Sequence, residues 1–439
     1  MRWVFVFFFA MSALFSAYSQ LGQYCIEGRF SETPYFEETD ILVDSNVIYG
    51  AAPRWPSQVV DTLRMDVYYP SLSADELAKR PFIMMIHGGA FLAGNRQDMR
   101  NTCRAFAQRG FVAATMTYRL GWDCDPNAGL LICLLCGNQA NKLPIAVYRA
   151  VQDARAALRF VAANAQQYGV DTSAFFIGGG SAGAVTALHT TFFTQEEADA
   201  ICPNCVTQIG PLDGGVNTIQ ANYHIRGVLN NCGAAVSLDV LNKDVPIVNF
   251  HDDLDCVVPS QYGHVLGCLN CQAFINAHGS QPIHQHLQGR ETCSELNLKL
   301  LSLGHCSFPE STVVNRSACF FKRLMCGECA SATNNNEWAV SPCSDLATSI
   351  SSPSRGELDF RCFPNPTSGR LNIELPQPAA GKVSISVYNN LGARLLHTME
   401  SPSERYELDL HALTPGMYWV IVTTGDRMGG RKVFLMSDF

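Results

Sequence analysis

A glycine-rich turn between an apolar run and a stretch of helical character constrains this chain more than any other feature. Residues 178–184 read Gly-Gly-Gly-Ser-Ala-Gly-Ala and directly follow the apolar run 174–177. Gly179, Ser181 and Gly183 form a G-x-S-x-G pattern, which gains meaning at a strand-to-helix turn. Such a turn strains the backbone of its serine, and a side chain at either flanking glycine would clash there. The pattern predicts a serine hydroxyl lifted clear of a sheet.

The groups that could activate this serine follow later in the chain. A serine becomes a good nucleophile when a histidine accepts its proton and an acid orients that histidine. A buried-strand pattern leads into a loop that contains Asp255, and the alternating-to-apolar strand pattern 296–303 ends shortly before His305. We therefore expect both side chains just past strand ends, where ligand-binding groups gather in open α/β sheets. His284 and His286 are alternatives to His305, but they lie in a polar stretch before the last strand.

A second glycine-rich turn precedes the first. Residues 87–91 read His-Gly-Gly-Ala-Phe and follow the buried-strand pattern 81–86. A turn of this kind exposes backbone N–H groups that can bind the oxyanion of a tetrahedral intermediate. The N–H of Ala182, next to the serine, would complete the hole. We expect His87 to be structural and to hydrogen-bond its own loop.

Four motifs in this order resemble those of carboxylesterases of the α/β-hydrolase superfamily, nearest to the hormone-sensitive-lipase and carboxylesterase branches. They are the turn at 87–91, Thr-Tyr-Arg-Leu-Gly at 117–121, the helical segment 151–160 and the Gly-x-Ser-x-Gly turn. The resemblance covers residues 55–325. It implies Ser181 as the nucleophile. The other residues that it implies are Asp255 as the acid, His305 as the base, and Gly88, Gly89, Ala90 and Ala182 as oxyanion donors.

This sequence departs from the family pattern at two places. Ala90 stands where a third glycine is common, and it keeps an N–H but has less backbone freedom. His-Asp at 251–252 stands where His-Gly is usual, so Asp252 and Asp253 are alternatives to Asp255. The family spacing to the following Val-Pro favours Asp255.

The triad and the oxyanion turn predict a serine hydrolase that cleaves carboxylic esters through an acyl-enzyme, with no metal or cofactor. Two alternatives are a serine peptidase of the same fold and a non-catalytic surface binding protein on a hydrolase scaffold. The natural ester could be a lipid, an acetylated sugar, a feruloyl linkage or a polyester. The balance of 39 acidic and 31 basic residues gives no footprint for nucleic acid.

The N-terminus predicts export. Residues 1–19 have the pattern of a signal peptide, with Arg2, the apolar run 3–15 and small residues before Gln20. The apolar run is shorter than the roughly 20 residues that span a bilayer. We therefore expect a mature chain without a transmembrane span, secreted or at the cell surface after passage through the periplasm.

Eighteen cysteines in an exported chain predict disulfides. Four C-x-x-C pairs occur, at 133/136, 202/205, 268/271 and 326/329. Zinc is the alternative, which their separate loops disfavour. Cys256 directly follows the expected acid and Cys306 directly follows the expected base. Because a triad brings acid and base together, we predict a Cys256–Cys306 disulfide.

Strand and helix patterns alternate along residues 20–329, which predicts an α/β catalytic domain with a mostly parallel sheet and helices on both faces. The expected strands are 63–69, 82–86, 112–117, 175–177, 247–250 and 298–303, and the expected helices include 146–168 and 313–325. Residues 121–144 interrupt the alternation. They form either a wall or lid over the acyl site or a disulfide-stapled surface loop.

The C-terminal part has a different composition. Residues 330–361 are rich in Ser, Asn and Thr, which predicts a linker, and short alternating strands at 362–439 predict a small antiparallel β-sandwich. Phe-Pro-Asn-Pro-Thr-Ser-Gly at 363–369 and Leu-Thr-Pro-Gly-Met-Tyr at 413–418 resemble the type IX secretion C-terminal sorting domain of Bacteroidetes. The resemblance implies the type IX secretion machinery as a partner. A carbohydrate-binding or spacer sandwich is the alternative.

Overall fold

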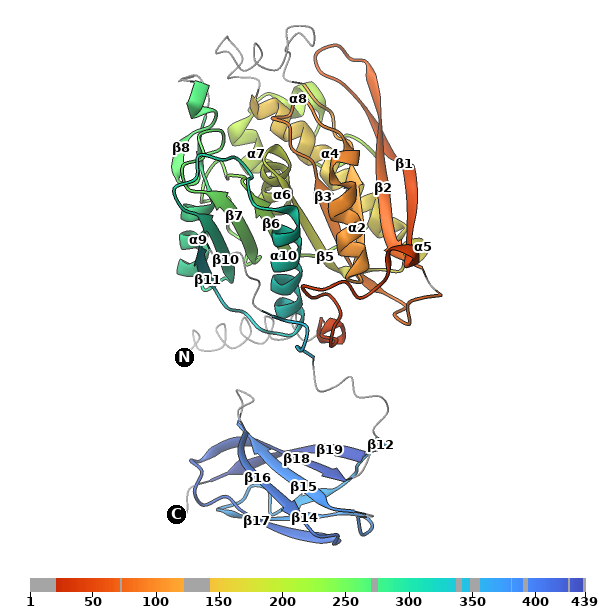
Figure 1. Ribbon diagram of the computed structural model, residues 1–439, viewed down its shortest axis with the longest axis vertical. Helices are drawn as coiled ribbons and strands as arrows, with labels where there is room; N and C mark the ends of the chain where they lie inside the picture. The colour runs from red at the N-terminus through yellow and green to blue at the C-terminus, as the bar shows by residue number, and fades with distance from the viewer. Residues whose placement is uncertain are drawn as a thin grey trace. The chain divides into compact units, whose positions relative to one another are not determined.

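The computed structural model describes two compact units, Met1–Thr348 and Ser349–Phe439 (Figure 1). The described residues are 21–71, 73–121, 143–269, 275–336, 342–347, 356–379, 381–389, 394–424 and 427–436. The expected signal peptide and nearly all of the segment 121–144 lie outside these residues. Among the helices of the described residues, none has the length and apolar character needed to cross a membrane.

The first unit is built on a nine-stranded sheet with the order β1-β2-β4-β3-β5-β6-β7-β10-β11. Its strands are β1 Ile41–Pro53, β2 Val60–Pro70, β3 Arg80–Ile86, β4 Val112–Met116, β5 Val170–Gly180, β6 Ile225–Asn231, β7 Ile247–Asp252, β10 Ser294–Lys299 and β11 Ala332–Asn335. β2 pairs antiparallel with β1 and with β4. The other neighbours in the sheet order, from β4 through β3, β5, β6, β7 and β10 to β11, all pair in parallel. The loops that follow β3, β5, β7 and β10 therefore meet at one edge of the sheet.

Helices cover both faces of this sheet, as Figure 1 shows. They are α2 Arg100–Gln108, α4 Leu143–Ala163, α5 Ala165–Tyr168, α6 Ala182–Phe192, α7 Gln195–Ile201, α8 Cys205–Ile209, α9 Ser280–Gly289 and α10 Glu310–Met325. Strand β3 shows why the sheet needs a layer of helices on each face. Met84 and Ile86 pack in one core with α4 and α6, whereas Ile83 and Met85 pack in another with α2 and α10. A strand that is apolar on both faces needs cover on both, so the predicted α/β fold is confirmed.

Short elements complete the first unit. Single 3₁₀ turns lie at η1 Gly22–Tyr24, η2 Glu38–Asp40, η3 Arg96–Met99 and η5 Gly267–Leu269. Strands β8 Tyr262–His264 and β9 Asn276–His278 form an antiparallel pair between β7 and α9. The residues from Asp253 to Gly279 are called the acid-loop excursion below, because Asp255 lies in it.

The last expected strand of the sheet is wrong beyond Lys299. The pattern predicts a strand over 298–303, but β10 ends at Lys299, opposite Asp252 at the end of β7. Leu301 then has a φ of 57°, and its side chain is 87% exposed. The chain turns there because β10 has reached the carboxyl edge of the sheet. The leucines that follow, which a continued strand would have buried, are therefore exposed to solvent.

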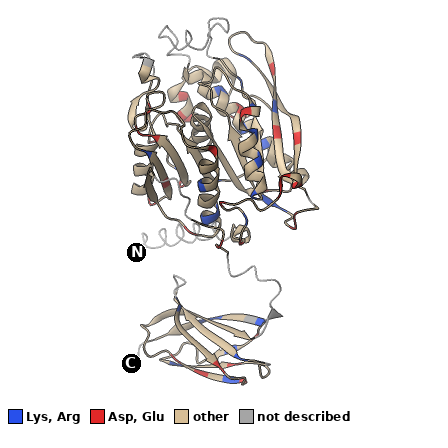
Figure 2. Ribbon diagram, viewed as in Figure 1, with Lys and Arg blue, Asp and Glu red and all other residues tan. Residues whose placement is uncertain are grey.

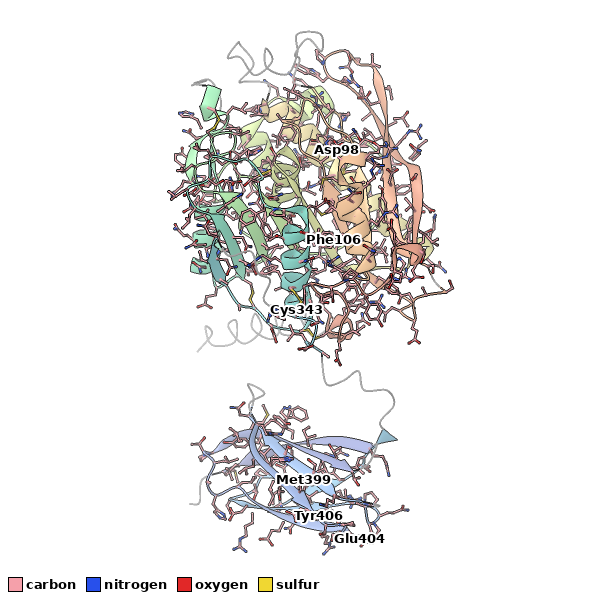
Figure 3. All side chains as sticks on the ribbon, viewed as in Figure 1. Asp98, Phe106, Cys343, Met399, Glu404 and Tyr406 are labelled. Atoms are coloured by element: carbon pink, nitrogen blue, oxygen red, sulfur yellow. A yellow bond between two sulfur atoms is a disulfide. The ribbon has the colours of Figure 1, made fainter. Side chains whose placement is uncertain are left out.

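The stretch predicted as a linker, 330–361, also differs from expectation. Strand β11 lies within it and extends the large sheet by pairing with β10. Cys343, labelled in Figure 3, is disulfide-bonded to Cys319 of α10. A polar segment can form an edge strand because main-chain groups supply the pairing. The first part of this stretch therefore belongs to the catalytic unit.

The second unit is a sandwich of two small sheets, as expected. One has the order β12-β19-β18-β15-β16 and the other β13-β14-β17. The strands are β12 Gly356–Glu357, β13 Arg361–Phe363, β14 Arg370–Glu374, β15 Val383–Tyr388, β16 Arg394–Glu400, β17 Arg405–Asp409, β18 Gly416–Thr424 and β19 Arg427–Leu435. Alternate residues Val383, Ile385 and Val387 point into the shared core. Figure 2 shows acidic and basic residues interspersed in both units, in keeping with a net charge of −8.

Candidate active site

Ser181 occupies a strained turn between β5 and α6. Its φ and ψ are 52° and −120°, a conformation that non-glycine residues rarely adopt. A Cβ added to Gly183 would overlap the carbonyl oxygen of Ile86 and lie 2.7 Å from that of His87, and one added to Gly179 would lie 2.6 Å from the carbonyl carbon of Gly183. Only glycine fits either position, which is the steric reason for the G-x-S-x-G pattern.

The structure brings Ser181, His305 and Asp255 together in one hydrogen-bonded chain. Ser181 Oγ lies 2.8 Å from His305 Nε2, and His305 Nδ1 lies 2.7 Å from Asp255 Oδ2. Asp255 follows β7 and His305 follows β10, so both come from the carboxyl edge of the sheet. If Nδ1 carries the proton, Nε2 can accept one from the serine hydroxyl.

Asp255 is fully buried at its side chain, yet its surroundings favour the carboxylate. Burial by itself raises the pKa of Asp255, but hydrogen bonds from His251 and His305 outweigh it and lower the pKa to about 2. The backbone N–H groups of Val257 and Val258 also donate to Oδ1, at 2.8 and 3.2 Å. The carboxylate is therefore charged and fixed in orientation at neutral pH.

The two neighbouring acids hold the loop that carries the histidine. Asp252 accepts hydrogen bonds from the hydroxyl of Ser302 at 2.5 Å, from the backbone N–H of Ser307 at 3.0 Å, and from the Ser307 hydroxyl. Asp253 accepts the backbone N–H of Ser302 at 2.9 Å. The alternatives that the sequence left open thus bond residues on either side of His305, and Asp255 alone of the three bonds the imidazole.

The predicted oxyanion turn lies directly against the serine. A Cβ added to Gly88 would be 2.9 Å from the carbonyl oxygen of Gly180 and 3.4 Å from the Cβ of Ser181. Gly89 has a φ of 106°, and Ala90 follows with a φ of 54°. Ala182 is the first residue of α6. Gly88 therefore packs against the backbone that carries Ser181, Ala182 directly follows the serine, and Ala90 lines the same pocket as both.

His87 is a structural part of this turn, as expected. Its Nδ1 bonds the carbonyl oxygen of Gly88 at 2.8 Å, and its ring stacks on Tyr118 with centroids 4.4 Å apart. The hydroxyl of Tyr118 in turn donates to the carbonyl oxygen of His87 at 3.0 Å. Burial lowers the pKa of His87, which keeps the ring neutral.

An apolar pocket of about 60 Å³ opens beside Ser181. Its lining is almost entirely aliphatic, with Phe91 from the oxyanion turn as the aromatic exception. The other lining residues are Ala90, Leu143, Val147, Ser181, Ala182, Val185, Ala234, Val236, Val257, Val258, Val265, Leu266, Ile275 and Ala277. Six of these come from the acid-loop excursion. Sequence reasoning missed this wall, because no periodic pattern distinguishes an excursion that lines a pocket from a surface loop.

The disulfide predicted between Cys256 and Cys306 is wrong. Cys306 is bonded to Cys232, at the end of β6, and Cys256 is bonded to Cys268 within the acid-loop excursion. The prediction assumed that neighbours of two touching residues also touch. Instead, the Cys306 side chain lies toward β6, with its Sγ 3.8 Å from the carbonyl oxygen of Asn231.

Three of the four remaining disulfides also join cysteines far apart in the sequence. The described residues contain the further disulfides Cys25–Cys326, Cys202–Cys205, Cys293–Cys329 and Cys319–Cys343. Of the four C-x-x-C pairs, only 202/205 is closed on itself within the described residues, and Cys133 and Cys136 lie outside them. Among the described residues, twelve cysteines are thus disulfide-bonded, as predicted for an exported chain, and Cys103 and Cys362 are free.

A serine at a strained strand-to-helix turn, with an acid and a histidine after later strands of a mostly parallel sheet, has the architecture of an α/β hydrolase. The BD-FAE family model matches residues 65–128 and 141–236, and the model described as "Secretion system C-terminal sorting domain" matches residues 361–435. The chain thus combines an α/β-hydrolase domain of the esterase type with a type IX secretion sorting domain.

Two curated relatives match parts of the chain. A probable isoprenylcysteine alpha-carbonyl methylesterase of rice (Oryza sativa subsp. japonica) is 25% identical over 234 residues, which are 51% of this chain and 47% of the relative. The neuroligin-like protein glit-1 of Caenorhabditis elegans is 30% identical over 126 residues, which are 29% of this chain and 15% of the relative. This chain therefore spans about half of one relative's length and less of the other's.

Solved esterase structures are also similar to this chain. Inhibited esterase B from Lactobacillus rhamnosis has a TM-score of 0.42 at 20% identity, covering 66% of this chain and 89% of that one. The apo form of esterase 2 from Thermogutta terrifontis has a TM-score of 0.42 at 18% identity, covering 67% of this chain and 97% of that one.

Proposed function

We propose that this protein is an exported serine carboxylesterase, in which Ser181 is the nucleophile, His305 the general base and Asp255 the acid that orients it. The observation that carries the proposal is the Ser181–His305–Asp255 hydrogen-bond chain, with distances of 2.8 and 2.7 Å, beside an apolar pocket. The esterase-type domain match supports the same reaction class.

In the first half of the reaction, His305 Nε2 takes the proton of Ser181 as its Oγ attacks the ester carbonyl carbon. The oxyanion that forms accepts hydrogen bonds from the N–H of Ala182 and from N–H groups of the turn formed by Gly88, Gly89 and Ala90. Loss of one such donor typically costs about 10²- to 10³-fold in rate. When the tetrahedral intermediate collapses, His305 passes its proton to the leaving alcohol, and the acyl group stays on Ser181.

In the second half, water replaces the alcohol. His305 takes a proton from the water, whose oxygen attacks the acyl carbon. Collapse of the second tetrahedral intermediate returns the proton to Ser181 and releases the carboxylic acid. Asp255 stays ionised throughout, stabilises the imidazolium that forms twice per turnover, and holds Nδ1 as the protonated nitrogen.

The pocket favours a short aliphatic acyl group. Its volume of about 60 Å³ is well below the roughly 150 Å³ that holds a benzene ring in an apolar cavity. Aliphatic side chains such as Val185 and Val236 offer dispersion contacts to methyl and methylene groups. We expect acetyl, propionyl and butyryl esters to be better substrates than long-chain or aromatic ones.

The C-terminal unit directs export in this proposal. A signal peptide at 1–19 would bring the chain to the periplasm, and the sorting domain, matched over 361–435, would engage type IX secretion. Mass spectrometry of cells and medium tests this step. Deletion of residues 362–439 should leave the catalytic unit in the periplasm, and unchanged export of the shortened chain would contradict it.

The decisive experiment is hydrolysis of p-nitrophenyl esters from acetate to decanoate by the full chain and by Ser181→Ala. Removal of a triad nucleophile costs about 10⁶-fold in kcat in a comparable hydrolase. We expect turnover by the wild type alone, together with labelling of Ser181 by a phosphonate probe. If both folded proteins are inert and unlabelled, the surface binding alternative replaces this proposal; labelling without ester turnover would favour the peptidase.

A further inference from the structure

We propose that the Cys232–Cys306 disulfide positions His305 for proton transfer, so that both cysteines are positioning residues of the active site. The inference rests on the proposed function, because it gives His305 the role of general base. Cys232 Sγ and Cys306 Sγ lie 4.0 and 3.9 Å from His305 Nε2, the nitrogen that bonds Ser181. The crosslink therefore lies beside the bond along which the proton moves.

The crosslink closes a ring that contains both the nucleophile and the base. The backbone N–H of Ser181 donates to the carbonyl oxygen of Asn231 at 2.9 Å, and Asn231 precedes Cys232. Cys232 is bonded to Cys306, which follows His305. The ring returns from His305 Nε2 to Ser181 Oγ at 2.8 Å. Apart from the two hydrogen bonds, every link in this ring is covalent.

The crosslink also spans a strand. The sheet order is β6-β7-β10, so a bond from the end of β6 to the loop after β10 passes across the end of β7. Cys232 is itself fixed to β7, because its N–H donates to the carbonyl oxygen of Phe250 at 2.8 Å. Three strand ends are thereby locked at the edge from which the acid and the base project.

Hydrogen bonds alone would hold His305 less rigidly than hydrogen bonds and the disulfide together. The imidazole is held at Nδ1 by Asp255, which fixes the direction of the ring but leaves the loop free to tilt about that bond. Asp252 holds Ser302 and Ser307 on either side of the histidine, through hydrogen bonds that can break singly. The disulfide is the covalent restraint on the Nε2 side. Misplacement of a catalytic group by about 1 Å can cost roughly 100-fold in rate.

The test compares two double variants of the full chain. Cys232→Ala with Cys306→Ala removes the proposed restraint, and Cys202→Ala with Cys205→Ala removes a disulfide between α7 and α8 as the matched control. With p-nitrophenyl acetate we expect kcat of the first variant to fall about 10- to 100-fold at an unchanged KM, since the acyl pocket is intact. The control should keep wild-type kcat.

Both variants are assayed well below their unfolding midpoints, with the folded fraction measured by circular dichroism. A purely structural crosslink would lower the midpoint of the first variant and leave kcat per folded molecule unchanged, which would overturn the inference. The rate at which a phosphonate labels Ser181 is a second readout that needs no ester turnover. An inert wild type that is still labelled would refute the esterase proposal alone, and equal labelling rates in wild type and variant would refute this one.

If the double variant does not fold, the folded wild type is treated with a phosphine reductant and its open disulfides are mapped by alkylation. Loss of kcat must then parallel opening of the Cys232–Cys306 pair. Loss that instead parallels opening of Cys256–Cys268 would place the restraint in the pocket wall and overturn the inference.

Discussion

The nucleophile side and the acid–base side of the candidate site are held by different physical means. On the nucleophile side, main-chain atoms touch: Gly88 packs against Gly180, and Gly183 packs against the end of β3 with no room for a Cβ. On the acid–base side, side chains bridge longer gaps. Asp252 and Asp255 each accept several hydrogen bonds, and two disulfides tie the loops.

The difference teaches where each side is vulnerable. Backbone packing tolerates no added atom, because main-chain groups already fill the space. A side-chain network tolerates changes in size, but it fails when one bond or one charge is lost. Substitutions should therefore separate the two sides by the kind of change that each cannot accept.

The largest effect is expected from one carbon atom on the nucleophile side. Gly183→Ala forces a Cβ into the carbonyl oxygens of Ile86 and His87, so the turn must open and Ser181 must move. We expect kcat for p-nitrophenyl acetate to fall at least about 100-fold, together with a lower unfolding midpoint. Gly289→Ala is the control, because an added Cβ there meets nothing within 4 Å. Wild-type kcat in Gly183→Ala would show that backbone packing does not fix the serine.

The next prediction concerns pH: between about pH 6.5 and 4, stability should be lost through a histidine on the nucleophile side, while the acid of the triad stays charged. His189 of α6 is buried, and burial lowers its pKa to about 4; its Nε2 accepts the N–H of Val236 at 3.3 Å. The unfolded chain binds a proton there below about 6.5, so stability is present at neutral pH and is lost as the pH falls from about 6.5 to 4. The loss approaches about 3 kcal/mol, at about 1.36 kcal/mol per pH unit. The Asp255 carboxylate, with its pKa of about 2, stays charged over this range.

Urea unfolding of the wild type and His189→Gln at pH 7 and pH 4.5 measures this effect. The variant has no proton to bind at position 189, so it should lose less stability on acidification than the wild type. Other buried histidines such as His87 titrate equally in both proteins and cancel in the difference. An identical pH dependence in the two proteins would exclude His189 as the acid-sensitive group.

The same contrast explains what could be predicted from the sequence. The nucleophile turn and the oxyanion turn are local, because their steric requirements lie within a few residues and appear directly as Gly-rich motifs. The strands and helices around them follow from apolar patterning. Sequence reasoning identified Ser181, Asp255 and His305, and the structure brings them together.

Features that depend on distant pairings could not be predicted. The partner of Cys306 is 74 residues away, and only the order of β6, β7 and β10 shows that the two are neighbours. The end of β10 is likewise set by its register with β7, not by the leucines that continue past it. Strand β11 lacks an apolar pattern altogether, since a polar edge strand is defined by the neighbour with which it pairs.

On the acid–base side, loss of one group should have an intermediate effect. Asp252→Ala removes the acceptor shared by Ser302 and Ser307, so we expect kcat to fall about tenfold at constant KM, measured with p-nitrophenyl acetate. Asp252→Asn is the matched control, because its amide oxygen can accept the Ser307 N–H and its NH₂ can donate to the serine hydroxyls. Wild-type kcat in Asp252→Ala would mean that the disulfide alone holds the histidine loop.

The smallest effect is expected where the histidine loop leaves the sheet. Leu301 has a φ of 57° and is 87% exposed, so the leucine carries a backbone cost of about 1 kcal/mol with little burial in return. Leu301→Asn should therefore raise the free energy of unfolding by about 0.5 kcal/mol, because asparagine accepts the left-handed conformation more readily.

Leu303→Asn is the control: that leucine is 78% exposed and is not among the residues with positive φ. Equal unfolding midpoints for the two variants would show that the turn after β10 is set by the loop's hydrogen bonds and not by the backbone preference of residue 301. An unchanged kcat in Leu301→Asn would further show that the exit from β10 and the placement of His305 are controlled separately, as the Asp252 bonds and the disulfide imply.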